Sequence, residues 1–241
     1  MIALGFLVAT WAATFLARRR DIDPDKLING CLVAFMCGIA GARLYYCALN
    51  WETFSQHPEQ IVATWQGGLS IHGGMIGALL AGWVYCRYSK LAFTTAIDIV
   101  GCVVPLAQAI GRWGNFFNSE AFGKPVPADF PLKLYIPPAM RPAGLEAHEY
   151  FHATFLYEMV WNLGVFALLY FFLYDRVRQY PGMAFLIYVF LYSIGRFAIE
   201  PMRTDSIMVG TVAAPYVVSG VLIVLCGIGI IFRYAAGKQP D

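Results

Sequence analysis

The chain has 241 residues, of which 59% are hydrophobic and 13% are charged, and its formal net charge is +2. Soluble domains carry about 25% charged residues, so this composition excludes an ordinary water-soluble fold, as does the mean hydropathy of +0.59. Because the chain has no long run of lysine and arginine, nucleic acid is excluded as a partner.

Seven apolar runs follow one another along the chain, and each approaches the ~20 residues that a helix needs to cross a bilayer. Inside hydrocarbon the backbone must satisfy its own hydrogen bonds, so each run is expected to be a helix. The sequence therefore predicts an all-α membrane protein, a bundle of seven transmembrane helices that forms one polytopic domain over residues 1–241. The runs cover residues 1–17, 27–49, 69–86, 91–117, 153–174, 182–200 and 211–232.

The basic residues in the connections predict the orientation of the bundle, because lysine and arginine collect in short cytoplasmic loops. They follow the first, third, fifth and seventh runs, which places the N-terminus outside and the C-terminus in the cytoplasm. The basic groups are Arg18, Arg19, Arg20 and Lys26; Arg87 and Lys90; Arg176 and Arg178; Arg233 and Lys238.

The first run is expected to remain in the protein as an uncleaved anchor. A secretory signal peptide carries its basic residues before the apolar stretch, whereas Arg18, Arg19 and Arg20 follow it. The run is short, because its 17 residues rise only about 25 Å against a hydrocarbon core of about 30 Å.

Three connections fall on the external side in this arrangement, at residues 50–60, 119–151 and 201–206. The segment 119–151 is rich in proline and has no helical period. These features indicate an external, periplasmic-side loop or cap region with its own order.

Cysteine and small residues have packing roles in this interpretation. The six cysteines lie in apolar runs without C-x-x-C or Cys/His metal spacing, so we expect small buried side chains and predict neither a metal nor a cofactor. Small residues at four-residue spacing are expected to let helices approach closely. They are Gly73, Gly77 and Ala81; Gly74, Ala78 and Gly82; and Ala34, Gly38 and Ala42.

Polar residues gather at the end of the fourth run, in the stretch GRWGNFFNSEAFGKP at residues 111–125. One face of the predicted helix carries Gln108, Arg112, Asn115 and Ser119. A guanidinium at membrane depth costs several kcal/mol unless it meets an anion or water, so Arg112 requires a partner. The structural alternative is an ion pair between Arg112 and Glu120 at the helix end.

A second polar face lies near the end of the sixth run, in the stretch YSIGRFAIEPMRTD at residues 192–205. It carries Tyr192, Arg196, Glu200 and Arg203 at helical spacing. A salt-bridge ladder through Glu200 is the structural alternative to a binding site here.

Together the two faces carry one more positive charge than negative, because three arginines stand against Glu120 and Glu200. The planar fork of arginine binds phosphate oxygens in two-pronged fashion, and phosphate is the abundant anion of a membrane. We therefore hypothesise a phospholipid headgroup site near the external surface.

His72 is a candidate base in the stretch GGLSIHGGMIGA at residues 67–78. Glycines on both sides leave space beside the imidazole, which can accept a proton near neutral pH. The alternative, which stays open, is a buried histidine with its hydrogen bonds satisfied.

Other polar residues within or beside the apolar runs are expected to be structural. In the stretch FHATFLYE at residues 151–158, His152 is expected in a loop, and Tyr157 and Glu158 as a hydrogen-bonded core pair. Arg43 and Asp98 are charges within the second and fourth runs that can satisfy each other or a neighbouring helix. Arg43 is therefore a weak site candidate.

Four blocks in one order resemble the prolipoprotein diacylglyceryl transferase family over nearly the whole chain. The second block fits the family signature G-R-x-x-N-F-x-N-x-E-x-x-G. The blocks are GGLSIHGGMIGALLAG, GRWGNFFNSEAFG, FHATFLYE and YSIGRFAIEPMR.

The resemblance implies a multi-pass enzyme of the bacterial cell (inner) membrane. Its reaction would transfer the sn-1,2-diacylglyceryl group from phosphatidylglycerol to the lipobox cysteine thiol of a preprolipoprotein. That reaction is the first step of lipoprotein biosynthesis, and it would form a thioether and release glycerol 1-phosphate. The implied partners are phosphatidylglycerol, lipobox peptides and membrane lipids, and no cofactor is implied.

The resemblance also implies roles for individual residues. His72 would be a base or an orienting group, and Arg112 and Arg196 would hold the phosphate, with Tyr192 as the fourth catalytic residue. The implied substrate-binding residues are Arg112, Asn115, Glu120, Gly123, Glu200 and Arg203.

The chain departs from the family pattern at three places. It begins Met1-Ile2-Ala3 where the family has a tyrosine, it has Ala153 in place of a proline, and its last run lacks the usual glutamine and serine. Two other functions remain as alternatives: a non-catalytic phospholipid-binding membrane protein, or a small transporter. A transporter predicts repeated halves, which the sequence does not show.

Overall fold

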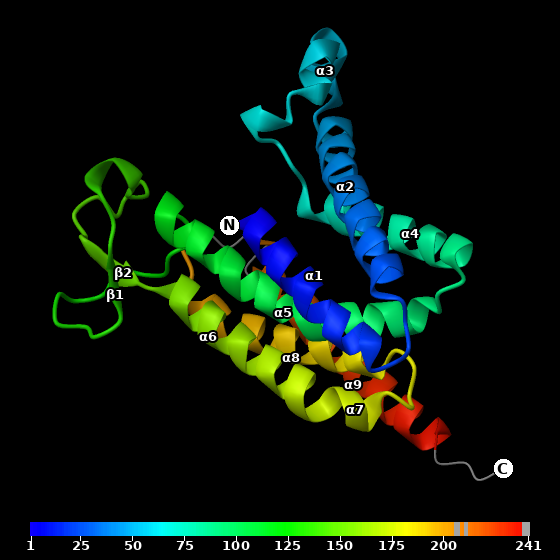
Figure 1. Cartoon of the computed structure of the whole chain (residues 1–241). Helices are drawn as coiled ribbons and strands as arrows, with labels where there is room; N and C mark the ends of the chain where they lie inside the picture. The colour runs from blue at the N-terminus through cyan, green and yellow to red at the C-terminus, as the bar shows by residue number, and fades with distance from the viewer. Residues whose placement is uncertain (205–207, 210–211, 238–241) are drawn as a thin grey trace. The chain divides into compact units, whose positions relative to one another are not determined.

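The structure is a computed structural model that describes residues 1–204, 208–209 and 212–237, and this part of the chain is mostly helical (Figure 1). The first elements are α1 (Ile2–Arg18), α2 (Pro24–Leu49), α3 (Trp51–Gln56), the 3-10 helices η1 (Pro58–Val62) and η2 (Thr64–Gln66), and α4 (Ile71–Ser89). They are followed by α5 (Phe93–Asn118), β1 (Lys133–Tyr135), the 3-10 helix η3 (Pro138–Met140), β2 (Tyr150–His152) and α6 (Thr154–Ala167). The last are the π-helix η4 (Leu168–Leu173), α7 (Tyr174–Val177), α8 (Met183–Ile199), the 3-10 helix η5 (Glu200–Met202), β3 (Met208–Val209), β4 (Val212–Ala213) and α9 (Ala214–Ala236).

Five helices are long and apolar enough to cross a membrane, so the chain is a multi-pass membrane protein. They are α2, α5, the continuous helix Thr154–Val177, the helix Met183–Met202 and α9. These five correspond to five of the seven expected runs. The other two runs form α1, which has 17 residues, and α4, which has 19 residues, and neither is among the five candidate spans.

The count of seven spans and their orientation remain predictions. Lys238 and residues 205–206, which entered the orientation, lie outside the described residues. The expectation of an all-α chain needs one correction, because β1 pairs with β2 and β3 with β4 in two short antiparallel sheets. Proline-rich and turn-forming segments between spans leave room for such pairs without a long strand period.

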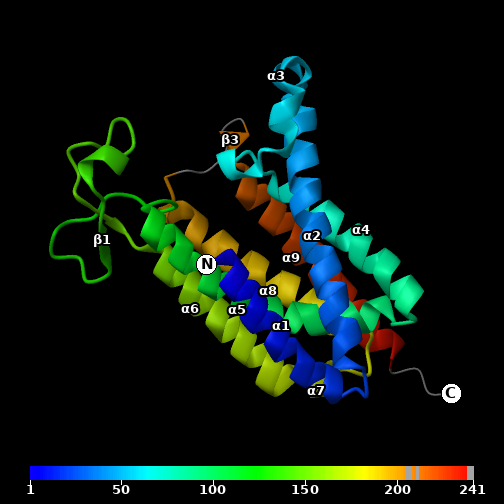
Figure 2. The same ribbon diagram turned by 45° about the horizontal axis from the view of Figure 1, so that its top comes forward.

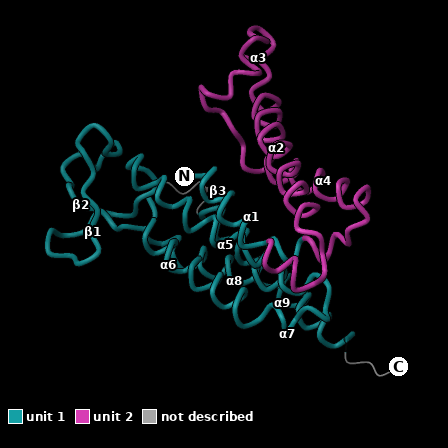
Figure 3. The backbone as a smooth tube through the Cα atoms, in the orientation of Figure 1, with its two compact units in different colours: residues 1–13, 97–241 teal, residues 14–96 magenta. Residues whose placement is uncertain are grey.

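The chain divides into two compact units, drawn in different colours in Figure 3. Unit 1 contains residues 1–13 and 97–241, and unit 2 contains residues 14–96. Unit 2 therefore holds α2, α3 and α4, and unit 1 holds the start of α1, most of α5 and the helices that follow.

In unit 2, α2 and α4 pack closely because small residues line their contact. A Cβ atom added at Gly38 would lie 3.3 Å from the carbonyl oxygen of Gly74, and one at Gly77 would lie 2.5 Å from that of Cys37. The prediction that these glycines set the approach of the helices is confirmed for this pair.

The cysteines follow the expectation of burial in part. All six are free thiols, and Cys47, Cys86, Cys102 and Cys226 are buried. Cys31 is half-buried and Cys37 is exposed, because α2 packs one face against α4 and leaves other parts of its surface open within unit 2.

In unit 1, α5 lies beside α8, α6 and the start of α1, an arrangement visible from two directions (Figures 1 and 2). Gly101 allows the close approach of α5 to α8, because a Cβ atom there would lie 3.0 Å from the Cα atom of Phe185. Asp98 of α5 accepts hydrogen bonds from the backbone N–H groups of Gly182 at 2.7 Å and Phe185 at 3.0 Å. It thereby caps the start of α8, where backbone N–H groups have no partner in their own helix.

The helix Thr154–Val177 widens at η4, where six residues form a π-helix. Tyr170, within η4, is buried and donates a hydrogen bond from its hydroxyl to the carbonyl oxygen of Ala12 at 3.1 Å. The π-helix thus carries a contact between this helix and α1.

The segment 119–151 is built around a small core of its own. In its sheet, Leu134 of β1 lies opposite Phe151 of β2, and Phe122, Ile136 and Phe151 form a buried cluster. The backbone of residues 123–126 bonds to β2 from the other side. Its expected position outside the membrane remains a prediction.

The surface of α9 is apolar along much of its length. Such a row of large side chains is unfavourable in water and favourable against lipid, in agreement with a membrane span. The exposed side chains are Val217, Val218, Val221, Val224, Leu225, Ile228, Ile231 and Phe232.

Candidate functional site

The chain leaves α5 through a turn with two non-glycine residues in the left-handed backbone region. Ser119 has a φ of 52° and Ala121 a φ of 54°, which L-residues rarely adopt. Two hydroxyls hold the turn: Thr154 Oγ1 donates to the Ala121 carbonyl at 2.5 Å, and Thr204 Oγ1 donates to the Phe122 carbonyl at 3.2 Å. The turn therefore fixes how the polar end of α5 meets the start of α6 and the segment after α8.

Gly123 follows this turn at a point where three segments meet. A Cβ atom there would lie 2.6 Å from the carbonyl oxygen of Met202 and 2.7 Å from the Cβ atom of His152. Its backbone also forms a bridge with Arg203. Glycine is required here for close packing, and a role of Gly123 in substrate binding stays a prediction.

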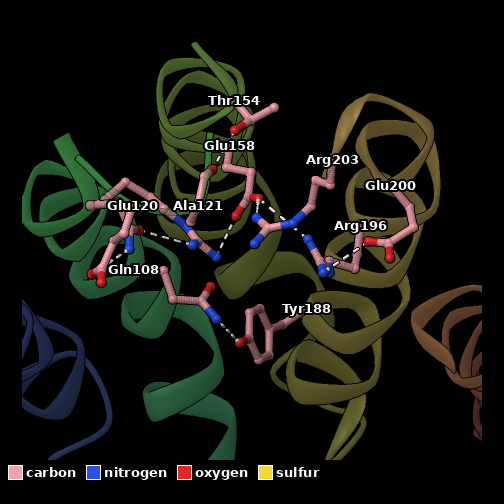
Figure 4. A network of polar contacts seen from close by, with 11 residues as sticks. Gln108, Glu120, Ala121, Thr154, Glu158, Tyr188, Arg196, Glu200 and Arg203 are labelled. Carbon is pink, nitrogen blue, oxygen red and sulfur yellow. Dashed lines mark hydrogen bonds and ion pairs between the residues drawn. The ribbon is translucent and has the colours of Figure 1, made fainter. Parts of the chain in front are cut away.

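The carboxylate of Glu158, near the start of α6, contacts the guanidinium groups of three arginines (Figure 4). Its Oε1 atom accepts hydrogen bonds from Arg203 Nη1 at 2.8 Å and from Arg196 Nη1 at 3.4 Å. Its Oε2 atom pairs with Arg112 Nη2. Glu158 is 6% exposed, so this contact is largely removed from solvent.

Glu200 and the Asn115–Glu120 pair extend the network at its two ends. Glu200 Oε2 lies 2.8 Å from Arg196 Nη2. Arg112 Nη1 donates to Asn115 Oδ1 at 3.1 Å, and Asn115 Nδ2 donates to Glu120 Oε1 at 3.1 Å. The guanidinium group of Arg112 is therefore held by Asn115 and Glu158. That of Arg196 is held by Glu200 and Glu158.

Three separate segments bring the arginines together. Arg112 comes from the last turns of α5, Arg196 from the last turn of α8, and Arg203 from the residue after η5. The two polar faces of the sequence therefore meet at one end of unit 1, beside the turn at residues 119–123.

The contacting groups carry balanced charges. Three guanidinium groups meet the two carboxylates of Glu158 and Glu200, and Glu120, which joins them through Asn115, brings the number of carboxylates to three. Glu158 therefore balances the extra cation that the two polar faces predict, and an anion that binds here must replace a carboxylate among the arginines. Among the described residues, no three His, Cys, Asp or Glu side chains are placed to hold a metal ion.

Two hollows adjoin the network. The larger has a volume of about 630 Å³, which is within the range of ligand pockets, and the smaller about 10 Å³, near the lower limit for one water molecule. The larger is lined by Met1, Ile2, Ala3, Gly111, Gly114, Asn115, Phe117, Asn118 and Glu120. The smaller is lined by Glu158, Trp161, Asn162, Tyr192, Gly195, Arg196 and Ile199.

Tyr192 borders the arginine cluster from within α8. Its ring centroid lies 6.1 Å from that of Tyr188, one helical turn earlier. The hydroxyl of Tyr188 accepts a hydrogen bond from Gln108 Nε2 at 2.9 Å. Gln108, which was expected on the face of Arg112, therefore links α5 to α8 below the cluster.

His72 lies in unit 2, in the first turn of α4. Its side chain is exposed, and its ring centroid lies 6.4 Å from that of Tyr45. Within unit 2 this exposed side chain does not match the alternative of a buried, satisfied histidine, and the role of His72 stays a prediction. Apart from the weak candidate Arg43, the other candidate residues belong to unit 1.

Arg43, the weak candidate, organises a loop of unit 2. Its guanidinium donates four hydrogen bonds of 2.5 to 3.0 Å to backbone carbonyl groups between residues 60 and 68, and it lies 5.2 Å from the ring centre of Phe54. These bonds satisfy the buried charge. Within unit 2, Arg43 thus meets backbone groups of the loop, and in unit 1 Asp98 accepts hydrogen bonds from the backbone at the start of α8.

Two expected pairs are replaced by others in the structure. Tyr157 does not pair with Glu158, because successive residues on a helix point about 100° apart; its hydroxyl lies 3.2 Å from His152 Nδ1. Arg112 pairs with Glu158 and reaches Glu120 through Asn115. A carboxylate within an apolar span requires a cation, and this is the one feature of the sequence that indicates the role of Glu158.

Comparisons with known proteins identify the family of the chain. The family model described as prolipoprotein diacylglyceryl transferase matches residues 1–233. Relatives named phosphatidylglycerol–prolipoprotein diacylglyceryl transferase include a protein of Thermosynechococcus vestitus, 43% identical over 242 residues, which cover 100% of this chain and 90% of the relative. Another, from Fervidobacterium nodosum, is 47% identical over 227 residues, covering 92% of this chain and 75% of the relative. A third, from Synechocystis sp., is 43% identical over 246 residues, covering 100% and 86%.

The match extends over almost the entire chain and includes all four blocks, three of which carry the arginines and His72. A family model that covers this much of the sequence, together with full-length relatives above 40% identity, defines membership. The chain therefore belongs to the prolipoprotein diacylglyceryl transferase family.

Proposed function

We propose that this chain transfers the sn-1,2-diacylglyceryl group of phosphatidylglycerol to the lipobox cysteine thiol of preprolipoproteins in the bacterial inner membrane. Full-length relatives that carry the name of this transferase support the reaction. The convergence of three arginines on one buried position carries the proposal, because the reaction requires cations around a departing phosphate.

In this reaction the thiol sulfur attacks the glycerol carbon that bears the phosphate ester. A C–S bond forms and the C–O bond breaks, which yields the thioether and glycerol 1-phosphate, while the thiol proton passes to a base or to the departing phosphate. The phosphate carries one negative charge as a diester and about two as a monoester. Negative charge therefore grows at the position that Arg112 and Arg196 surround.

The neighbouring polar residues position these two arginines. Asn115, held by Glu120, accepts from Arg112 Nη1 at 3.1 Å and leaves the other terminal nitrogen of Arg112 to face the cluster. Glu200 holds Arg196 in the same manner at 2.8 Å. Orientation of this kind raises the rate because the donors are fixed before charge develops.

Tyr192 and His72 are the other two proposed catalytic residues, beside Arg112 and Arg196. Tyr192 lines the small hollow with Arg196 and Glu158, so its hydroxyl would donate to a phosphate oxygen only once the side chains around this hollow move apart, and Arg203 supplies the third cation. His72, exposed at the start of α4, would accept the thiol proton or orient the acceptor.

The proposed topology has seven spans in a single polytopic domain, with the N-terminus outside and the C-terminus in the cytoplasm. Residues 119–151 would form the external cap, and the arginine cluster would lie at the level of the outer leaflet. The direct backbone link between Gly123 and Arg203 supports this level for the cluster. Phosphatidylglycerol and the preprolipoprotein would both reach the arginine cluster from within the bilayer.

The function is tested with purified protein in vesicles of phosphatidylglycerol and a lipobox peptide. We expect the peptide to gain the mass of one diacylglyceryl group, and a peptide with alanine in place of cysteine to gain none. Vesicles of phosphatidylcholine serve as the lipid control.

Other outcomes separate the alternatives. Binding of phosphatidylglycerol without transfer to the peptide would indicate a non-catalytic lipid-binding protein. Passage of a solute across sealed vesicles, with neither lipid binding nor transfer, would indicate a transporter. Labelling of the alanine peptide would contradict attack by the thiol.

A further inference from the structure

Glu158 occupies the position among the three arginines that a phosphate would be expected to take. Its two oxygens face Arg112, Arg196 and Arg203, and its side chain is 7% exposed. Carboxylate and phosphate groups offer arginine similar pairs of oxygen acceptors. A bound phosphate and Glu158 must therefore share the same N–H donors.

We propose that Glu158 is a positioning residue that holds the arginines together between turnovers and competes with phosphate for them, so that it promotes release of the phosphate product. This inference rests on the proposed function, since it assigns the product as a phosphate monoester. Glu158 itself takes no part in bond formation.

The contact distances indicate which arginine is exchanged. Arg203 Nη1 is 2.8 Å from Glu158 Oε1, whereas Arg196 Nη1 is 3.4 Å from the same atom. Arg196 also lies 2.8 Å from Glu200 through its other terminal nitrogen. The longer contact is the weaker one, so Arg196 turns toward phosphate while Arg203 stays with Glu158.

Charge explains why this competition favours turnover. The lipid phosphodiester carries one negative charge and the monoester product about two at neutral pH. Repulsion from a fixed carboxylate grows with the charge of the ligand. Glu158 therefore opposes the product more strongly than the lipid substrate, and it restores the arginine arrangement as the product leaves.

Binding measurements on the purified full chain test the inference directly. We would measure the dissociation constants of glycerol 1-phosphate and of inorganic phosphate by calorimetry, and of phosphatidylglycerol in phosphatidylcholine nanodiscs. For Glu158→Gln we expect glycerol 1-phosphate to bind about tenfold tighter and phosphatidylglycerol about threefold tighter, because the removed repulsion scales with ligand charge. The exposed Glu149→Gln variant is the matched control and should leave both constants unchanged.

Kinetics provide a readout that a purely structural role would not move. In Glu158→Gln, both kcat and the KM for phosphatidylglycerol should fall, and added glycerol 1-phosphate should inhibit more strongly. If Glu158 only orders the arginines, its loss would weaken binding of both ligands and raise KM. Weaker or unchanged anion binding in this variant overturns the proposal.

A second variant covers the case in which Glu158→Gln does not fold. Glu158→Asp keeps the charge and moves it one methylene away from the arginines, so glycerol 1-phosphate should bind two- to threefold tighter, as a partial loss of repulsion predicts. Unchanged or weaker binding in a folded Glu158→Asp overturns the proposal. Because binding is measured without a peptide, a failure of transfer in the wild-type protein would reject the proposed function separately.

Discussion

Arg203 Nη1 donates a hydrogen bond of 2.8 Å to Glu158 Oε1, although 45 residues separate the two in the sequence. The bond joins the segment after η5 to the start of α6, and Arg203 is also bridged through its backbone to Gly123. One residue thus ties the charged cluster to the strained turn after α5. Substitutions in the segment after η5, at the start of α6 or in the turn after α5 are therefore expected to alter the positions of the arginines in the cluster.

Arg112→Lys is expected to lower the rate of transfer by about 100-fold or more while the protein remains folded. Arg112 uses two different nitrogens, one toward Asn115 and one toward Glu158, and a single ammonium group cannot reproduce this fork. Arg196→Ala should have an effect at least as large. Transfer rates and thermal unfolding are measured together, with the exposed Arg176→Lys as control; full activity in both variants would point to packing roles.

Gly123→Ala is expected to destabilise the fold by about 1–3 kcal/mol, the usual range for forced overpacking. The new methyl group would lie 2.6 Å from the Met202 carbonyl oxygen, and neither backbone segment can move without breaking bonds to the other. Gly111→Ala is the matched control, since no atom lies within 4 Å of its added Cβ. Equal melting temperatures for the two variants would contradict the packing role of Gly123.

Asp98→Ala is expected to lower the free energy of unfolding by about 1–3 kcal/mol, because it removes the acceptor of two half-buried N–H groups. The affected groups belong to Gly182 and Phe185 at the start of α8. Hydrogen exchange should accelerate there first, and Asp98→Asn, which keeps one acceptor, should be intermediate. The exposed Asp25→Asn is the control, and unchanged exchange at residues 182–185 would refute the cap.

Arg43→Lys is expected to loosen the loop at residues 57–70 without unfolding α2 and α4. A lysine ammonium can replace some of the four bonds that the guanidinium donates to the loop, but not their geometry. Limited proteolysis should cut the loop several times faster than in wild type or in the exposed Arg87→Lys control. Equal cutting rates would show that the loop is held by other contacts.

His72→Gln separates a proton-accepting role from a spacing role. If His72 accepts the thiol proton, the rate of transfer should rise with pH in the wild-type protein, and the variant should lose this rise and be slower throughout. The rate is measured against pH for both proteins, with the exposed loop variant His148→Gln as control. An unchanged profile in His72→Gln would remove the base role.

Helical periodicity anticipated the parts of the fold that depend on local sequence. The apolar runs became helices with ends shifted by a few residues, and the glycines of α2 and α4 meet as their spacing predicts. Periodicity also placed Arg112 with Asn115 and Arg196 with Glu200 on common helix faces. These pairs are three or four residues apart, which is the distance over which a helix pattern is informative.

Contacts between distant segments could not be predicted in this way. Glu158 was expected to pair with its neighbour Tyr157, because nothing in the local pattern shows which arginines will face α6. Ser119 and Ala121 are ordinary residues by composition, and their left-handed conformation is imposed by bonds from Thr154 and by the chain that follows. Tertiary contacts decide such positions, so they emerge only with the fold.

The π-helix η4 changes how the long helix Thr154–Val177 can be redesigned. A π turn uses an i to i+5 bond and accommodates one extra residue compared with an α turn, so the angular phase of the side chains differs before and after Leu168–Leu173. Tyr174, which is fully buried beyond η4, faces inward because of that added residue. Deleting a single residue from η4 would let this turn close as a regular α turn and leave the facing of the later half unchanged, whereas deleting one residue from the α-helical part before η4 would turn the later half by roughly 100° and present its lipid-facing side chains to the protein interior.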